Sequence, residues 1–104
     1  MQSNNHASSF GKKIRSLREE KNLSLKELSQ KIGIDASLLG KLERDERAPT
    51  KNQIKIFSVF FKFSEQFLIR ENLSDQFAYK VLEANADLEI FRVAEKKIEY
   101  LKKN

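Results

Sequence analysis

The chain has 104 residues, a formal net charge of +5 and no cysteine. A chain of this length holds one small domain and at most an appended subdomain, and the absence of cysteine excludes disulfides and thiolate metal sites. No apolar run approaches the roughly 20 residues that span a bilayer, so we expect a soluble intracellular protein that does not enter membranes. The polar residues 1–8 predict a disordered leader.

The first regular element is predicted to be a helix over residues 10–21. Ser9 is placed to cap it. Phe10, Ile14 and Leu17 recur at helical spacing on one face, whereas apolar residues in a half-buried strand would alternate. This face is therefore expected to pack on the core.

Two short helices follow, and a tight turn at Gly33 joins them. Ser24 and Glu27 form a capping-box pattern that starts the second helix at Leu25, and Asp35 is placed to cap the third helix. The turn favours a residue that tolerates positive φ, as glycine does. The pattern predicts a helix-turn-helix, with an ordinary helical hairpin that binds nothing as the alternative.

A fourth helix is predicted to open at a second capping box, formed by Thr50 and Gln53, and to run to about residue 61. Ser64 is expected to cap a short fifth helix. The fourth helix is apolar on nearly all sides, because Ile56 and Val59 lie off its core stripe. A helix of this kind is buried on more than one face, so the tail of the chain is expected to cover it.

The tail is predicted to form two more helices, capped by Ser74 and Asp87. The sequence thus predicts seven helices and no strand. The expected fold is all-α, with a five-helix domain that contains the helix-turn-helix over residues 9–73 and a two-helix extension over residues 74–104.

Apolar residues of the last helix recur at three, four and three positions, which is the spacing of a coiled-coil seam. Together with the surplus apolar residues of the fourth helix, they predict a homodimer interface. Packing of the tail within the same subunit is the alternative. The predicted interface comprises Ile56, Val59, Phe77, Phe91, Ala94, Ile98 and Leu101.

The segment from Phe10 to about Leu68 resembles the lambda-repressor/Cro-type helix-turn-helix domain, often called the Xre family. The run FGKKIRSLREEKNLSLKELSQKIGIDASLLGKLERDERAPT carries the resemblance. Leu-Ser at positions 23 and 24, the turn at Gly33 and Leu-Glu-Arg before Pro49 all stand in the family's register. Phe77-Ala78-Tyr79 and the run from Val93 to Lys97 resemble the two-helix tails of small Xre-like proteins encoded beside restriction-modification genes.

The resemblance implies that the third helix enters the major groove of double-stranded DNA. Leu38 is expected either to pack inward or to touch a thymine methyl or the sugar-phosphate edge. Arg18 and Glu43 are expected to face each other as a partly buried ion pair. By register, the implied base contacts are Ala36, Ser37, Gly40 and Lys41, and the implied phosphate contacts are Lys26, Leu38, Arg44, Arg47 and Lys51.

Two positions depart from the family pattern. Position 25 is often a glutamine that reaches phosphate or base in relatives, and here it is leucine. Gly40 offers no side-chain donor within the recognition helix. Direct readout is therefore expected to be limited, and sequence specificity to depend on Lys41, Ser37 and deformation of the DNA.

The positive charge lies in the DNA-binding part of the chain. Residues 10–73 contain fourteen Lys or Arg against nine Asp or Glu, while residues 74–104 contain six of each sign. A polyanion attracts a domain of this kind, and binding should weaken as salt rises. A merely solvated basic surface is the alternative.

No motif predicts an enzyme, a cofactor or a metal site. The single histidine, His6, has no neighbouring ligands, and no phosphate-binding glycine loop occurs. The first functional hypothesis is a homodimeric transcription regulator that binds a palindromic operator and controls its own or a neighbouring operon. The alternative is an antitoxin or adaptor whose last helices bind another protein, and RNA polymerase or a toxin-like protein is the candidate partner.

Overall fold

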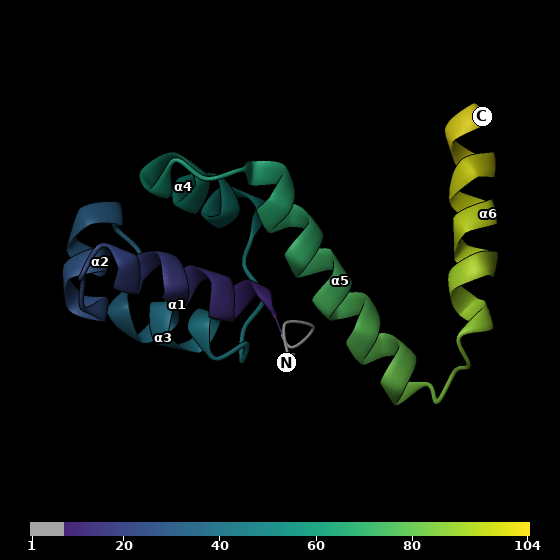
Figure 1. Cartoon of the computed structure of the whole chain (residues 1–104), viewed down its shortest axis with the longest axis horizontal. Helices are drawn as coiled ribbons and strands as arrows, with labels where there is room; N and C mark the ends of the chain where they lie inside the picture. Colours follow the sequence, from purple (N-terminus) through teal and green to yellow (C-terminus); the bar gives the residue numbers. More distant parts are fainter. Residues whose placement is uncertain (1–7) are drawn as a thin grey trace.

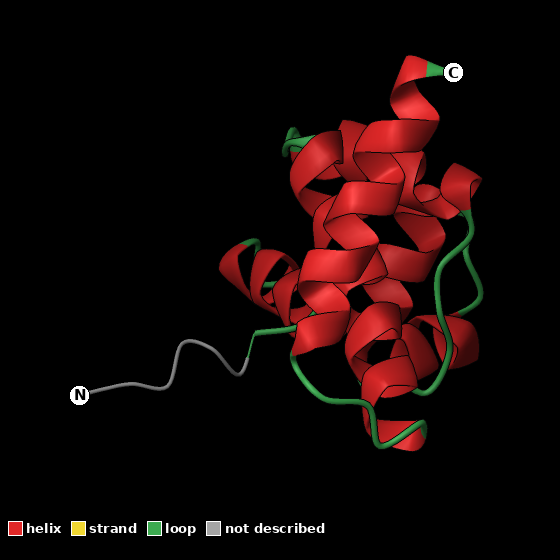
Figure 2. Cartoon of the chain, turned by 90° about the vertical axis from the view of Figure 1, so that its right-hand side faces the viewer, coloured by secondary structure: helices red, strands yellow, loops and turns green. Residues whose placement is uncertain are grey.

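The computed structural model describes residues 8–104, which form six helices and no strand (Figure 2). The predicted leader at residues 1–8 lies outside the described part of the chain, apart from Ser8. The helices are α1 (Phe10–Glu20), α2 (Leu25–Ile32), α3 (Ala36–Glu43), α4 (Lys51–Phe61), α5 (Glu65–Glu83) and α6 (Glu89–Lys103).

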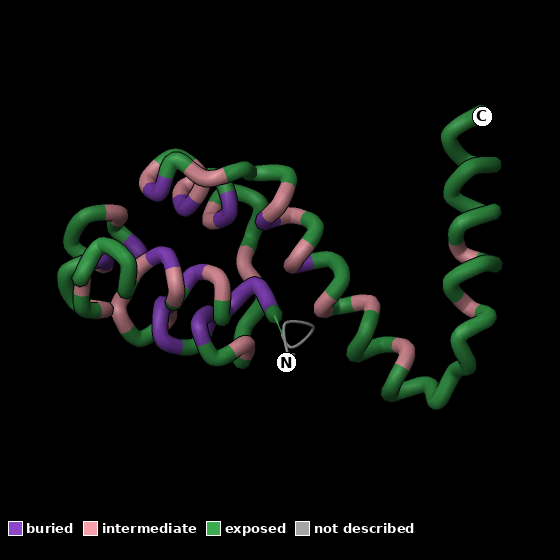
Figure 3. The backbone as a smooth tube through the Cα atoms, in the orientation of Figure 1, coloured by how far each residue is buried: buried purple, intermediate pink, exposed green. Residues whose placement is uncertain are grey.

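Helices α1 to α4 and the first half of α5 enclose the hydrophobic core (Figures 1 and 3). The apolar faces predicted for the first three helices all point into it. Aromatic rings of α1 and α4 meet there, with the centroids of Phe10 and Phe57 6.0 Å apart and nearly edge to face. The fully buried core side chains are Phe10, Ile14, Leu28, Leu39, Leu42, Phe57 and Leu68.

Polar side chains cap the helices of the core where the sequence predicts them. Ser9, Ser24, Asp35 and Thr50 each accept a hydrogen bond from a backbone N–H in the first turn of the helix that follows. Both capping boxes are present in full. Gly33 has a φ of 77°, in the left-handed region that glycine adopts without steric cost. These caps fix where α2 and α3 begin and hence the angle of the helix-turn-helix.

The predicted helix break at Ser74 is wrong, because α5 continues through it to Glu83. The Ser74 hydroxyl donates instead to the backbone carbonyl of Glu71, at 3.1 Å. A serine inside a helix satisfies its hydroxyl in this way without ending the helix, and neither glycine nor proline occurs nearby. The cap predicted at Asp87 is one residue off, because the N-cap of α6 is Leu88, although the carboxylate of Asp87 still accepts from the N–H of Glu89 at 3.1 Å.

Helix α6 stands apart from the core and does not cover α4 within the same chain (Figure 1). None of its residues is buried. Its start is held against α5 by Phe77 and Phe91, whose rings meet nearly edge to face at 5.1 Å. Val59 of α4 remains 71% exposed. No described helix is both long enough and apolar enough to cross a membrane.

Candidate nucleic-acid interface

Helix α3 divides cleanly into a buried face and an exposed face. Leu39 and Leu42 are fully buried in the core. Ser37 and Lys41, four residues apart, point to solvent on the other side, and Ala36 is half-buried beside them. The helix therefore presents a hydroxyl and an ammonium group on one outward ridge.

Gly40, predicted to touch a base, is buried in this structure. A Cβ atom at this position would lie 3.0 Å from Nη1 of Arg44 and 3.7 Å from Cδ1 of Leu25. The flexible Arg44 side chain thus covers the backbone at Gly40, and a base reaches that backbone only after the guanidinium turns away. The leucine that replaces the family's glutamine packs beside the glycine.

Four of the five predicted phosphate contacts are exposed cations: Lys26, Arg44, Arg47 and Lys51. Lys26 and Lys51 lie in the first turns of α2 and α4, where the helix dipole favours a negatively charged ligand. Leu38, the fifth, is half-buried and packs against the core. The structure therefore matches the inward-packing alternative for Leu38.

Arg44 has an intramolecular partner that the sequence reasoning missed. Its Nε donates to Oε2 of Glu46 at 2.8 Å, and Nη2 donates to Oε1 at 3.3 Å. The hydrogen bond from Arg44 lowers the pKa of the exposed Glu46 carboxyl below its ordinary value. A phosphate that binds Arg44 must therefore replace this carboxylate. The only sequence signal for this ion pair is that two residues of opposite charge lie two positions apart.

Arg18 of α1 and Glu43 of α3 form a bidentate ion pair behind the ridge. The two hydrogen bonds, from Nε and Nη2 to the carboxylate, measure 2.7 and 2.9 Å. The side chains are only 13% and 5% exposed. The hydrogen bond to Glu43 raises the pKa of Arg18, although burial opposes this. Nη1 also donates to the carbonyl of Leu23 at 2.8 Å, so one guanidinium ties α3 to both α1 and the loop before α2.

The start of α1 presses directly on the end of α3, a contact that the sequence analysis did not identify. A Cβ atom on Gly11 would lie 2.5 Å from the carbonyl oxygens of Leu42 and Glu43. The carboxylate of Asp45, just after α3, accepts from the Gly11 N–H at 2.9 Å and from the Ser9 hydroxyl at 2.6 Å. Glycine at position 11 therefore allows the recognition helix to reach the first turn of α1.

A second carboxylate reaches the same turn from α5. Asp75 accepts from the N–H of Phe10 at 2.9 Å. Burial raises the pKa of the Asp75 carboxyl, the hydrogen bond from Phe10 lowers it, and the negative charges of Asp45 and Glu71 raise it further. Nearby, the hydroxyl of Ser8 donates to Glu71 at 3.2 Å. The start of α1 thus joins α5 to the loop that follows the recognition helix.

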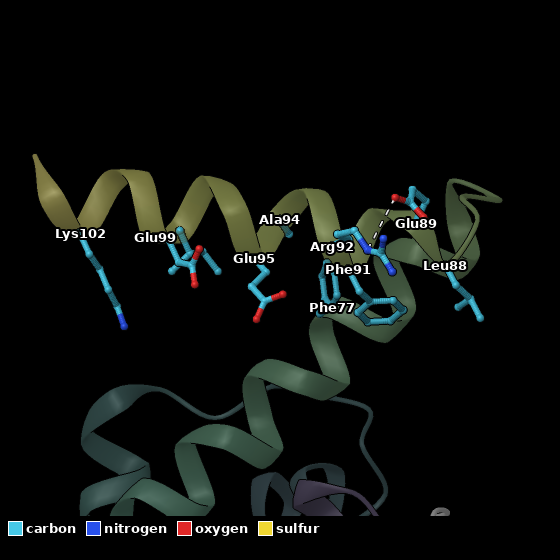
Figure 4. A pocket seen from close by; sticks show the side chains of 10 residues that line it. Phe77, Leu88, Glu89, Phe91, Arg92, Ala94, Glu95, Glu99 and Lys102 are labelled. Atoms are coloured by element: carbon cyan, nitrogen blue, oxygen red, sulfur yellow. Dashed lines mark ion pairs between the residues drawn. The ribbon is translucent and has the colours of Figure 1, made fainter.

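The residues predicted to form a dimer interface fall into two groups within one chain. Phe77 of α5 lines one groove with Phe91, Ala94 and Ile98 of α6 (Figure 4). Leu101 is exposed farther along α6. The remaining two, Ile56 and Val59, lie on α4, away from this groove.

A helix-turn-helix with an outward polar ridge and flanking cations is a module for the major groove of DNA. A family model described as helix-turn-helix matches residues 14–68, more than half of the chain. The chain belongs to this family, the DNA-binding transcription regulators of the Xre or lambda-repressor-like type.

Two solved structures are similar to this chain. One is a crystal structure of SinR, a master regulator for biofilm formation, in complex with DNA; it is 31% identical with a TM-score of 0.54, and the match covers 58% of this chain and 97% of that one. The other is a complex of the SinR and SinI proteins, 22% identical with a TM-score of 0.55, covering 91% and 99%. At that identity the second likeness shows the fold alone. A comparison with curated proteins gives no match.

Proposed function

We propose that the protein binds a palindromic operator in double-stranded DNA as a homodimer and regulates its own or a neighbouring operon in the cytoplasm. The outward ridge of α3, with Ser37 and Lys41 exposed above a fully buried apolar face, is the observation that supports this proposal. A helix of this design fits the major groove and presents donors to base edges. Repression requires only that the operator overlap a promoter.

In the proposed complex, the ridge reads bases and the surrounding cations fix its position. Lys41 donates to O6 or N7 of guanine, Ser37 donates or accepts, and the methyl group of Ala36 contacts a thymine methyl. Lys26, Arg44, Arg47 and Lys51 bind phosphates on either side of the groove. The SinR structure supports this arrangement, because it contains a similar protein in complex with DNA.

Replacing Lys41 with alanine is expected to relax sequence preference at one position of each half-site. A good base contact contributes about 1 to 3 kcal/mol of discrimination. The measurement is selection from random duplex DNA with wild-type protein and Lys41→Ala. Arg47→Ala is the matched control, because loss of a phosphate contact weakens binding to all sequences alike and lowers the salt dependence by about one counterion. Unchanged base preference in Lys41→Ala would contradict the assigned readout.

The homodimer proposal is supported by the apolar surface that one chain leaves uncovered. Helix α6 buries no residue, and Leu82, Leu88 and Leu101 are exposed on α5, the turn and α6. Surface of this kind marks an interaction site. The helix also begins with the acidic Glu89 and ends with Lys102 and Lys103, so antiparallel pairing of two copies brings opposite charges together. We therefore assign the occupant of this surface to α6 of a second copy.

Ile98→Glu is expected to make the protein monomeric. The side chain is 53% exposed in the single chain, so the glutamate is accommodated in a monomer but places a charge in the seam between two copies. Sedimentation equilibrium at micromolar concentration measures the change. Val93→Glu is the control, because Val93 lies on the opposite side of α6 from the groove. A dimer that survives Ile98→Glu would place the interface elsewhere.

A second candidate function is an adaptor or antitoxin whose tail binds a different protein. The uncovered apolar face of α6 also suits this function, and the similar fold of SinR is found in a complex with the protein SinI. Wild-type protein that stays monomeric with and without DNA favours this second function. Self-association that Ile98→Glu abolishes favours the first.

A further inference from the structure

Two carboxylates bind consecutive backbone N–H groups in the first turn of α1. Asp75 accepts from Phe10, and Asp45 accepts from Gly11, both at 2.9 Å. These N–H groups have no partner within the helix, so the carboxylates satisfy them and oppose the positive end of the helix dipole. The two acids come from different parts of the fold, and each therefore attaches its own segment to α1.

Asp45 attaches the end of α3, the helix that reads DNA in the proposed complex. Asp75 attaches the part of α5 that follows it, residues 76–83, which leads to the proposed dimer interface and is called the α5 arm below. Asp45 lies two residues after the end of α3. Asp75 lies midway along α5, and beyond it the helix leaves the core, with most of its side chains exposed (Figures 1 and 3). Asn72 and Leu68, one and two turns earlier, are the buried residues in the first half of α5. Asp75 thus acts at the point where the arm departs from the domain.

We propose that Asp75 sets the spacing between the two half-sites of the operator by fixing the angle of the α5 arm relative to the recognition helix. The inference rests on the homodimer of the proposed function, because only two joined recognition helices have a spacing to control. Asp75 touches no DNA and is a positioning residue. Its effect passes through the N–H of Phe10 and the first turn of α1, which Asp45 and Gly11 join to the end of α3.

The part of α5 beyond Asp75 is long enough for this role. From Asp75 to the end of α5 is about 12 Å at 1.5 Å per residue, so a tilt of about 10° moves that end by about 2 Å. Two arms in a symmetric dimer add their displacements, and the sum exceeds the rise of about 3.4 Å per base pair of DNA. One base pair also rotates a half-site by roughly 34° about the DNA axis. A loosened arm that both tilts and turns therefore permits half-sites that are one base pair closer or farther apart.

The test selects binding sites from a library in which the half-sites enriched by the wild type are separated by every spacer within one helical turn. Wild type is expected to enrich one spacer. Asp75→Ala is expected to enrich neighbouring spacers as well, by about one base pair on each side, with unchanged base preference within each half-site. Asp75→Asn keeps an acceptor oxygen for the N–H of Phe10 and should retain the wild-type spacer. Ser74→Ala, at the adjacent exposed position, is the control and should do the same.

A second measurement reads the geometry directly. Because the chain contains no cysteine, Ser37→Cys carries one spin label on each recognition helix of the dimer. The distance distribution between the two labels should be narrow in wild type and in Asp75→Asn, and broad in Asp75→Ala. Should Asp75→Ala fail to fold, Asp75→Glu replaces it, and its longer side chain should shift the preferred spacer.

Three outcomes are decisive. Broadened or shifted spacing with intact half-site preference supports the role of Asp75. Wild-type spacing and a narrow label distance in the variants overturn it, while the homodimer on a palindrome stands. A wild-type protein that enriches no paired half-sites overturns the proposed function and, with it, this role of Asp75.

Discussion

Gly11→Ala is expected to destabilise the folded protein by about 3 kcal/mol, at the upper end of what overpacking costs. The added methyl group would lie 2.5 Å from two backbone carbonyl oxygens and 2.6 Å from Oδ1 of Asp45. Carbonyls of a helix end cannot rotate away as a side-chain tip does, so α1 and α3 must separate. That separation also lengthens the hydrogen bond from the Gly11 N–H to Asp45. Urea unfolding followed by circular dichroism measures the loss.

Gly40→Ala is the matched control, because it is the same substitution in another buried helical glycine. Its methyl group would meet Nη1 of Arg44 at 3.0 Å, and that group is the free end of a flexible, largely exposed side chain. Alanine favours a helix over glycine by about 1 kcal/mol, so Gly40→Ala should be neutral or stabilising. Equal losses of stability in the two variants would show that a clash with the carbonyls of α3 is not the cause of the loss in Gly11→Ala.

Glu43→Ala is expected to cost about 3 to 5 kcal/mol, the range found when one partner of a buried ion pair is removed. The guanidinium of Arg18 would lose two hydrogen bonds and keep only its bond to the carbonyl of Leu23. Its charge would stay largely buried without a counterion. Thermal and urea unfolding give the size of the effect, and a melting temperature close to that of wild type would contradict it.

Two further variants distinguish the two possible causes of the lost stability, an unpaired buried charge and lost packing. Glu19→Ala removes the exposed partner of Arg15 on α1. The distance between these two charged groups, 3.0 Å, is similar to that between Arg18 and Glu43. The variant should change the free energy of unfolding by less than about 1 kcal/mol. The double variant with leucine at positions 18 and 43 removes both charges and should be more stable than Glu43→Ala. If the double variant were as unstable as Glu43→Ala, the loss of stability would come from lost packing and not from the unpaired charge of Arg18.

Much of the fold is predictable because its determinants are local in sequence. The capping box at Ser24 and the glycine at position 33 define the start and end of α2 within one turn each. The apolar spacing of Leu39 and Leu42 assigns the buried face of α3, and the exposure of Ser37 and Lys41 follows from it. Positions of this kind need only helix geometry and the chemistry of caps.

The remaining features depend on contacts between residues far apart in the chain. Ser74 is a residue type that caps helices, but α5 continues past it, and the next residue, Asp75, accepts a hydrogen bond from the distant N–H of Phe10. Asp45 stands in the left-handed region at a φ of 60°, and its role appears only when α1 lies against it. Likewise, nothing in the sequence shows that Arg44 covers Gly40. The exposed face of α3 and the ion pair of Arg18 with Glu43 could be predicted from the sequence, whereas the contacts of Gly11, Asp45 and Arg44 could not.

The last helix of the chain has one further consequence. It contains 15 residues and buries none of them, and a helix of this length is only marginally stable alone in water. Its helical state therefore draws on whatever packs against it. In the proposed homodimer that is a second copy, so the fraction of chains with an ordered α6 should rise with the concentration of the protein. In that dimer, the degree of order in α6 depends on how much of the protein is present.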